Sequence, residues 1–328
     1  MNRVKIAIRM LAIIMVIACA FLVFMAWHWG ALTPQPRVST AGFASNHTAL
    51  AVIINLDPVR EVVSTIAAQK TGRPAWLFQD LLPYEGALLM NVPEDRTQQQ
   101  ICLAVSPKRL GPLVPILTSW LFSPQPIGSF QWSTPGIVWQ DGVLMARLAG
   151  TASEDTMATV RERWPDNSSE SIKLEGGHML EAVVDNRGGR GLVAVEGLAN
   201  LVEGLSTPEK PAEKRQELQR IFDAQQLSGL FYRASVARLT GDMLDSDTIV
   251  LKTALECSDE QGATAMEFAL LTVRDLLFAQ LIENGIILEG DPVKEGANVR
   301  MELRLMGCNA ALARIAGNEA QKDGRTSS

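Results

Sequence analysis

An apolar run over residues 10–31 constrains this chain more than any other feature. Only His28 and Gly30 fall outside the apolar set, and the run contains no acidic residue, no Lys and no Arg. A helix of this length covers about 33 Å, which is enough to cross a hydrocarbon core of about 30 Å. The sequence therefore predicts a single N-terminal transmembrane helix over residues 10–31.

The basic residues around the run predict its orientation. Arg3, Lys5 and Arg9 precede it, whereas only Arg37 follows closely. Positive charge is retained on the cytoplasmic side of a membrane. We therefore expect residues 1–9 to be cytoplasmic and the bulk of the chain to be periplasmic, as in a single-pass protein of a bacterial inner membrane.

Two other interpretations of the run fit less well. A cleavable signal peptide has a shorter apolar core and a small-residue cleavage site, but here bulky residues continue to Trp29. The residues before Cys19 resemble a lipobox, yet the apolar sequence AFLVFMAW follows this cysteine, where a lipidated cysteine normally opens a polar tether. A signal-anchor helix remains the expectation.

The remainder of the chain predicts an α+β fold with antiparallel sheets. Residues 32–48 are rich in Pro, Ser, Thr and Gly, which is typical of a flexible tether. Two similar halves follow, 49–205 and 227–317, each in the order strand, hairpin, helix, hairpin, helix. The charged residues 206–226 predict a linker helix, and residues 318–328 form a polar tail. One composite sheet and two separate sheets are both compatible with this pattern.

Several local signals carry the predicted repeat. Asp-Gly at 141–142, between alternating apolar residues, predicts a hairpin, and Ser153 predicts a helix N-cap. In the second half, residues 248–256 and 264–272 are expected to pair as a hairpin around the polar residues between them. A helix is expected over residues 274–284.

The sequence from Gly189 to Ala194 matches the G-x-G-x-x-A pattern of dinucleotide-binding loops. Such a site needs a strand and then a helix whose N-terminus receives the pyrophosphate. Here residues 192–197 favour the return strand of a hairpin, with residues 186–191 as its turn. We therefore expect no cofactor at this position.

A short acidic segment is the nearest match to a metal site. Asp242, Asp245 and Asp247 are spaced like calcium ligands. However, Ile249 and Val250 occupy the positions where a calcium loop needs an oxygen ligand and a glycine. The segment therefore predicts a polar turn before a strand.

The remaining residues give no catalytic pattern. His28, His47 and His178 are far apart in the sequence, and the chain lacks H-E-x-x-H, G-x-S-x-G, S-x-x-K and P-loop motifs. We expect no catalytic, cofactor-binding or metal-binding residues, and no enzyme. Cys257 and Cys308 both adjoin predicted strand ends, so a disulfide between them is left open.

Charge argues against nucleic acid as the main partner, because the chain has 30 basic and 36 acidic residues and a net charge of −6. The sequence thus favours a membrane-anchored, non-enzymatic scaffold or interaction protein of a bacterial envelope. Its partners would be other envelope proteins or a second copy of itself. The alternative is a ligand-binding module that holds a lipid or small apolar molecule in a cleft between the two halves.

Overall fold

The computed structural model describes residues 24, 33–121, 126–127, 129–163, 172–205, 233–283, 285–308 and 310–311. Residues 1–9, the predicted linker helix 206–226, the tail 318–328 and all of the predicted span except Phe24 lie outside this part of the chain. Within the part that is described, no helix has the length and apolar character needed to cross a membrane.

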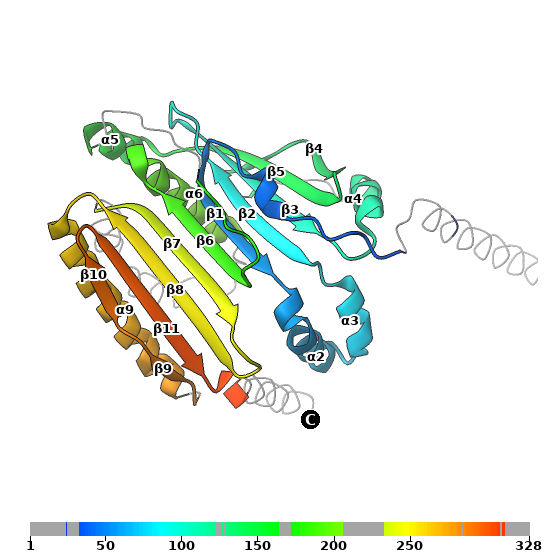
Figure 1. Ribbon diagram of the computed structural model, residues 1–328. Helices are drawn as coiled ribbons and strands as arrows, with labels where there is room; N and C mark the ends of the chain where they lie inside the picture. The colour runs from blue at the N-terminus through cyan, green and yellow to red at the C-terminus, as the bar shows by residue number, and fades with distance from the viewer. Residues whose placement is uncertain are drawn as a thin grey trace, which may run out of the picture.

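The described strands form one antiparallel sheet, with eleven strands in the order β10-β11-β8-β7-β6-β1-β2-β3-β5-β4 and β9 paired to β11 (Figure 1). The expected antiparallel α+β fold is confirmed, as one composite sheet. The strands are β1 (Thr48–Asn55), β2 (Glu85–Asn91), β3 (Gln98–Ser106), β4 (Gln131–Gln140), β5 (Val143–Thr151), β6 (Leu180–Asp185), β7 (Ala234–Met243), β8 (Thr248–Cys257), β9 (Ile287–Glu289), β10 (Pro292–Glu295) and β11 (Asn298–Met306).

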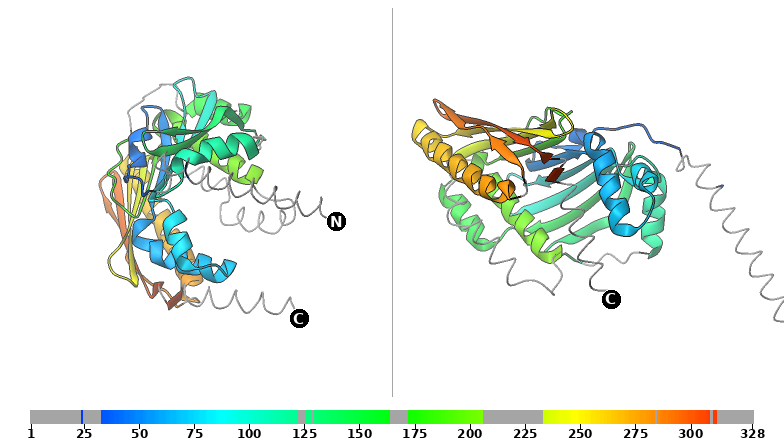
Figure 2. Two further views of the ribbon diagram at one scale, coloured as in Figure 1. Left: turned by 90° about the vertical axis from the view of Figure 1, so that its right-hand side faces the viewer. Right: turned by 90° about the horizontal axis from the view of Figure 1, so that it is seen from below.

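Most of the long helices lie on one side of this sheet. Figure 2 shows α4, α5, α6 and α9 against one face, which we call the helical face; the opposite face is the open face. The helices are η1 (Thr40–Phe43), η2 (Asp57–Val59), α2 (Arg60–Thr71), α3 (Ala75–Leu81), η3 (Gly111–Leu113), α4 (Val114–Leu121), α5 (Glu154–Arg163), η4 (Arg187–Gly189), α6 (Arg190–Leu205) and α9 (Glu260–Ile282).

The chain leaves the central β1–β6 pair twice with the same order of elements. After β1 it forms α2 and α3, the hairpin β2–β3, α4 and the hairpin β4–β5. After β6 it forms α6, the hairpin β7–β8, α9 and the hairpin β10–β11. The strands of each series occupy matching places on the two sides of the β1–β6 pair.

The two largest clusters of buried residues lie on opposite faces of the sheet. Successive residues of a strand point to opposite faces, so Leu50 packs under α6 whereas Ala51 packs on the open face. The helical-face cluster contains Ala49, Leu50, Met90, Val92, Ile101, Leu148, Val160, Val193, Ala194 and Leu201. The open-face cluster contains Ala51, Ile53, Ala87, Leu89, Cys102, Ala104, Val143, Met145, Ile172 and Val183.

Local signals in the first half are confirmed. Asp141 and Gly142 both have positive φ, 50° and 83°, in the turn that joins β4 to β5. Ser153 Oγ accepts a hydrogen bond from the Thr156 N–H and caps α5. The Asp-Gly turn and the N-cap were therefore sufficient to place these elements.

The predicted strand at 264–272 is wrong, because these residues lie within α9. The partners of β8 are β7 and β11, so residues 248–256 pair on both sides without it. Asp259 is the N-cap of α9, and its Oδ1 accepts the Gly262 N–H at 2.6 Å. The polar residues expected to form a hairpin turn instead begin a helix, since N-caps and turns favour the same residue types.

Candidate functional site

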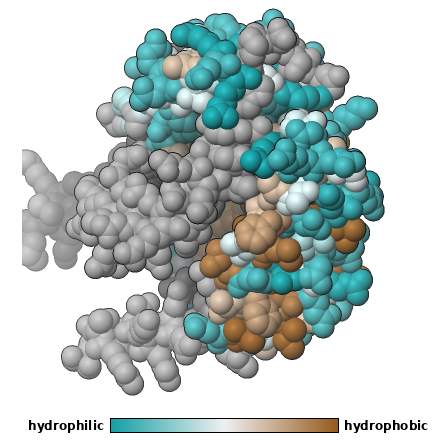
Figure 3. Space-filling model, turned by 90° about the vertical axis from the view of Figure 1, so that its left-hand side faces the viewer, coloured by the Kyte–Doolittle hydropathy of each residue, from teal (hydrophilic) through white to brown (hydrophobic). Residues whose placement is uncertain are grey.

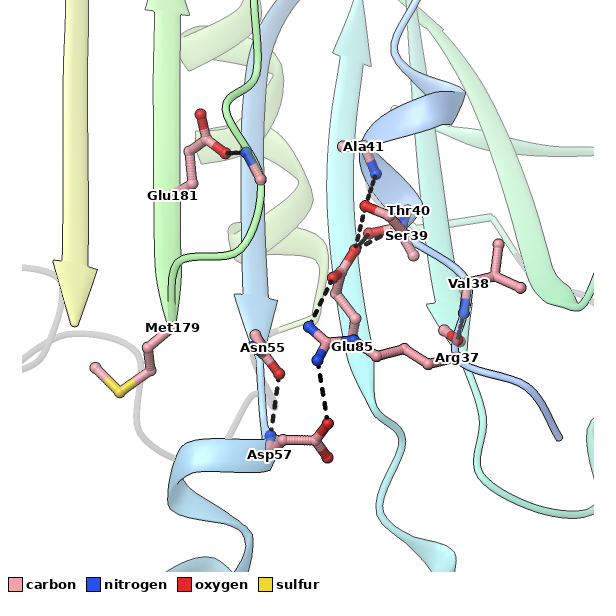
Figure 4. A network of polar contacts seen from close by, with 12 residues as sticks. Arg37, Val38, Ser39, Thr40, Ala41, Asn55, Asp57, Glu85, Met179 and Glu181 are labelled. Atoms are coloured by element: carbon pink, nitrogen blue, oxygen red, sulfur yellow. Dashed lines mark hydrogen bonds and ion pairs between the residues drawn. The ribbon is translucent and has the colours of Figure 1, made fainter. Parts of the chain in front are cut away.

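A buried carboxylate at the start of β2 binds the segment that precedes β1 (Figure 4). Glu85 is 3% exposed. Its Oε1 accepts hydrogen bonds from the Thr40 N–H and the Thr40 hydroxyl, both at 2.6 Å, and from the Ser39 hydroxyl at 3.3 Å. Arg37 lies 3.8 Å from Oε2 and also pairs with Asp57. We call this group the Glu85 network.

The Glu85 network explains why residues 35–48 differ from the flexible tether expected there. A buried charge is stable only when it is paired and hydrogen-bonded, and here the donors come from the chain before β1. The Gln35 N–H also donates to the Lys108 carbonyl, and the Val38 N–H donates to Ser106 Oγ. With Phe43 packed on the open-face cluster, this segment covers part of the sheet.

A second buried carboxylate, Glu181 of β6, holds another irregular segment on the same face. Its two oxygens accept the Glu175 N–H at 2.8 Å and the Gly176 N–H at 2.9 Å. Arg238 of β7 donates to Glu181 at 3.1 Å. Leu174 packs on the open-face cluster beside it. The open face is thus covered at its centre by two segments, each bound through one glutamate.

His178 is held between two carboxylates. Its Nδ1 lies 2.7 Å from Asp242 Oδ2 and its Nε2 lies 3.3 Å from Glu175 Oε2. Burial alone would lower the pKa of His178, but the hydrogen bonds to Asp242 and Glu175 outweigh it, so the pKa is raised above its ordinary value. A histidine with a carboxylate on each nitrogen is favoured as the cation, which fits an ion-pair role better than that of a general base.

The glycine-rich segment at 189–194 lies at the junction of β6 and α6, so the return strand predicted at 192–197 is wrong. The strand, turn and helix that a dinucleotide loop requires are present, but the helix start is filled by its own side chains. Asn186 Oδ1 accepts the Leu192 N–H at 3.0 Å. The guanidinium of Arg190 is buried 2.7 Å from Asp185. The Leu192 N–H near the start of α6 therefore already has a hydrogen-bond partner within the chain.

Residues 244–247 form the predicted polar turn before a strand, whereas Asp242 lies in β7. Asp245 Oδ1 accepts the N–H groups of Asp247 and Thr248, whereas Asp242 faces His178. The carboxylates of Asp242 and Asp245 therefore bind different partners. Over the described part of the chain, no three His, Cys, Asp or Glu residues are grouped so that they could hold a metal ion.

The disulfide left open between Cys257 and Cys308 is absent, since both thiols are free. Cys257 ends β8, whereas the Cys308 N–H bonds to the Asp247 carbonyl just before β8 begins. At the rise of an antiparallel strand, the two cysteines are roughly 30 Å apart. Burial raises the pKa of each thiol, which keeps both in the weakly nucleophilic protonated form.

Exposed apolar side chains gather along α9 (Figure 3). Its first turns pack on the helical face through Ala263 and Met266. Further along, large apolar side chains are in contact with solvent, and Phe268 is 72% exposed. We give the name α9 stripe to the following exposed residues, which at 3.6 residues per turn lie around the helix and not on one side of it: Phe268, Val273, Leu276, Leu277, Phe278 and Ile282.

A second exposed apolar group lies on the other side of the molecule. Trp76 and Leu81 of α3 are 65% and 47% exposed, and Ile116 of α4 is 37% exposed. The segment before η1 leaves the body between these two helices (Figure 1). We call this side the α3–α4 edge.

Comparison with known proteins gives no family. No family model matches the chain, and no curated protein matches it. Among solved structures, crystal form IV of TP0453 has 10% sequence identity and a TM-score of 0.38, covering 85% of this chain and 97% of the other. Crystal form III of the same protein has 9% identity and a TM-score of 0.37, covering 86% and 99%. Likeness at this level establishes neither a family nor a function.

Proposed function

We propose that this chain is a membrane-anchored, non-enzymatic scaffold or interaction protein of a bacterial envelope. Residues 10–31 form its single span, residues 1–9 are cytoplasmic, and the described body lies in the periplasm. The apolar span and the basic residues before it support this placement. The repeated order of elements on the two sides of the β1–β6 pair supports a body of two similar halves.

The α9 stripe carries the proposal of an interaction role. Large apolar side chains that face solvent together mark sites of protein–protein or membrane contact more often than scattered ones do. Five of the six stripe residues lie in the last ten positions of α9, and each of them is at least 37% exposed. We propose that another envelope protein or a second copy of this chain binds there.

The polar clusters support the non-enzymatic part of the proposal. Glu85 and Glu181 are used to bind irregular segments to the sheet. His178 is paired on both ring nitrogens. Each of these groups therefore has a structural partner that accounts for its position.

The ligand-binding alternative has no geometric support in the described residues. It requires a cleft between the two halves, but β6 pairs directly with both β1 and β7. The sheet is therefore continuous whether the halves are divided between β1 and β6 or between β6 and β7, and we do not pursue this alternative.

Photo-crosslinking in native membranes tests the interaction role. A photoreactive residue at Leu276 or Phe278 is expected to yield a defined adduct, with a second copy or another envelope protein. The matched control is Arg304 on the open face, which is also exposed. Recovery of monomer alone from both α9 positions would contradict the proposal.

The anchor is tested separately by alkaline carbonate extraction and by protease protection of sealed inner-membrane vesicles. We expect the chain to stay in the membrane fraction after carbonate treatment. Release into the supernatant would refute the anchor without bearing on α9.

A further inference from the structure

The path of the chain before η1 limits where the body can stand relative to the proposed span. The first described backbone hydrogen bond in this region joins the Gln35 N–H to the Lys108 carbonyl at 2.8 Å. Gln35 is four positions after Ala31, the last residue of the apolar run. Four fully extended residues cover at most about 14 Å. The body can therefore stand no further than this from the end of the span.

The bilayer itself occupies much of that distance. The headgroup layer on each side of the hydrocarbon core is roughly 5–8 Å thick. Since Gln35 is at most about 14 Å from the core boundary, it lies within or just beyond the headgroups. Whatever part of the body surrounds Gln35 is therefore held at the membrane surface.

That part is the α3–α4 edge. Lys108, which accepts the Gln35 bond through its carbonyl, donates through Nζ to Asp80 of α3 at 2.8 Å. Arg109 adds a second contact to Asp80 at 3.4 Å. Trp76 precedes Asp80 by one helical turn, about 6 Å along the axis, and lies on the same side of α3.

The position of α3 is fixed by Arg60 of α2. Its guanidinium donates to Asp57 and to the carbonyls of Gln79, Leu82 and Pro83, at distances between 2.7 and 3.2 Å. These bonds hold α2, α3 and the start of β2 as one unit. The exposed Trp76 is therefore presented in a defined place beside the exit of the chain.

We propose that the α3–α4 edge rests on the bilayer crossed by residues 10–31, with Trp76 in the headgroup layer. Tryptophan favours this layer because its ring is apolar while its N–H can hydrogen-bond. Leu81 and Ile116 lie on the same edge and face the acyl boundary. The proposal rests on the membrane anchor proposed above, and its partner is the phospholipid surface.

Labelling with a photoreactive phospholipid tests this orientation. The full chain is reconstituted into vesicles of phosphatidylethanolamine and phosphatidylglycerol that contain a diazirine phospholipid, irradiated, digested and analysed by mass spectrometry. We expect label on residues 10–31 and on α3, and none on the α9 stripe. The α9 stripe is the internal control, because it also carries large exposed apolar side chains, which are 37–72% exposed against 65% for Trp76.

The outcomes separate this proposal from the anchor. Label on residues 10–31 without label on α3 would overturn the orientation and leave the anchor intact. Absence of label from residues 10–31 would overturn the anchor, and the orientation with it. Label on the α9 stripe in place of α3 would show that the opposite side of the body meets the lipid.

Two variants test the cause of the contact. Insertion of ten Gly and Ser residues after Ala31 increases the reach of the connection by roughly 18 Å. It should reduce the label on α3 severalfold without changing that on residues 10–31; an unchanged α3 signal would refute the short connection as the cause. Trp76→Ser should also reduce the α3 label, whereas Leu244→Ser, at an equally exposed residue in the β7–β8 turn, should not.

Discussion

Replacement of Glu85 by Ala is expected to release the segment before β1 from the sheet. The variant removes the acceptor of two 2.6 Å hydrogen bonds from Thr40 and of a weaker one from Ser39. A hydrogen bond to a charged group contributes about 1.5–3 kcal/mol, so the two short bonds together contribute about 3–6 kcal/mol. The Thr40 amide would then be left buried without a partner unless the segment moves into water.

The assay is hydrogen exchange of the full chain, followed by mass spectrometry of a peptide spanning residues 36–44. A loss of about 3 kcal/mol corresponds to roughly 100-fold faster exchange where opening is local, since each 1.4 kcal/mol is a factor of ten. The β1 amides should keep their protection, because their partners in β2 and β6 are unchanged.

The matched control is Glu181→Ala, which removes a carboxylate buried just as deeply. It should accelerate exchange at Glu175 and Gly176 and leave residues 36–44 protected. Equal protection of residues 36–44 in the Glu85 variant and the unmodified chain would refute the reasoning. So would equal release of both segments in either variant.

Three further predictions concern stability and the thiols. Gly197→Ala should lower the free energy of unfolding by about 1–3 kcal/mol in urea titrations, because a Cβ there would lie 2.3 Å from the Gln99 side chain and 2.7 Å from the Met90 side chain. Gly86→Ala is the control: a Cβ at Gly86 has no neighbour within 4 Å, so the free energy of unfolding should change by less than about 0.5 kcal/mol. The pKa of His178 is raised in the folded chain, so protonated His178 stabilises the fold fully below pH 6.5, the ordinary pKa of histidine, and this stabilisation is lost as the pH rises through the higher pKa of the folded chain. The urea concentration at the midpoint of unfolding should therefore fall over that pH range. The variant His178→Gln should not show this pH-dependent fall. Cys257 and Cys308 should both react with a thiol reagent after denaturation without reductant, and a mass consistent with a disulfide between them would contradict the structure.

Elements with strong local signals could be predicted from the sequence. The Asp-Gly turn at 141–142 and the Ser153 cap each need only neighbouring residues, and both are in place. The N-cap of α9 is equally local, yet the sequence predicts a hairpin turn and a strand at this place. Asp259 and the residues around it are suited both to a turn and to an N-cap, and the short, mostly apolar segment 264–272 does not by itself distinguish a strand from a helix.

The features that matter for the candidate sites depend on distant contacts. Nothing in the composition of residues 35–48 indicates that they bind the sheet, because Glu85 becomes a buried acceptor only once β2 has formed. In the same way, a largely apolar helix such as α9 is expected to be buried on all sides. Which of its side chains are exposed is known only from how the helix packs in the folded chain.

The Glu85 network also has a mechanical consequence. Tension that enters the body from residues before Gln35 meets the bonds at Gln35, Val38 and Thr40 before it can reach β1. These few contacts come before β1 along the chain, and β1 is hydrogen-bonded to a neighbouring strand on each side, β2 and β6. A pull from the membrane would therefore detach the segment first and lengthen the connection by several residues, while the sheet remains intact. The hydrogen bonds to Glu85 would break before any force acts on the strands of the sheet.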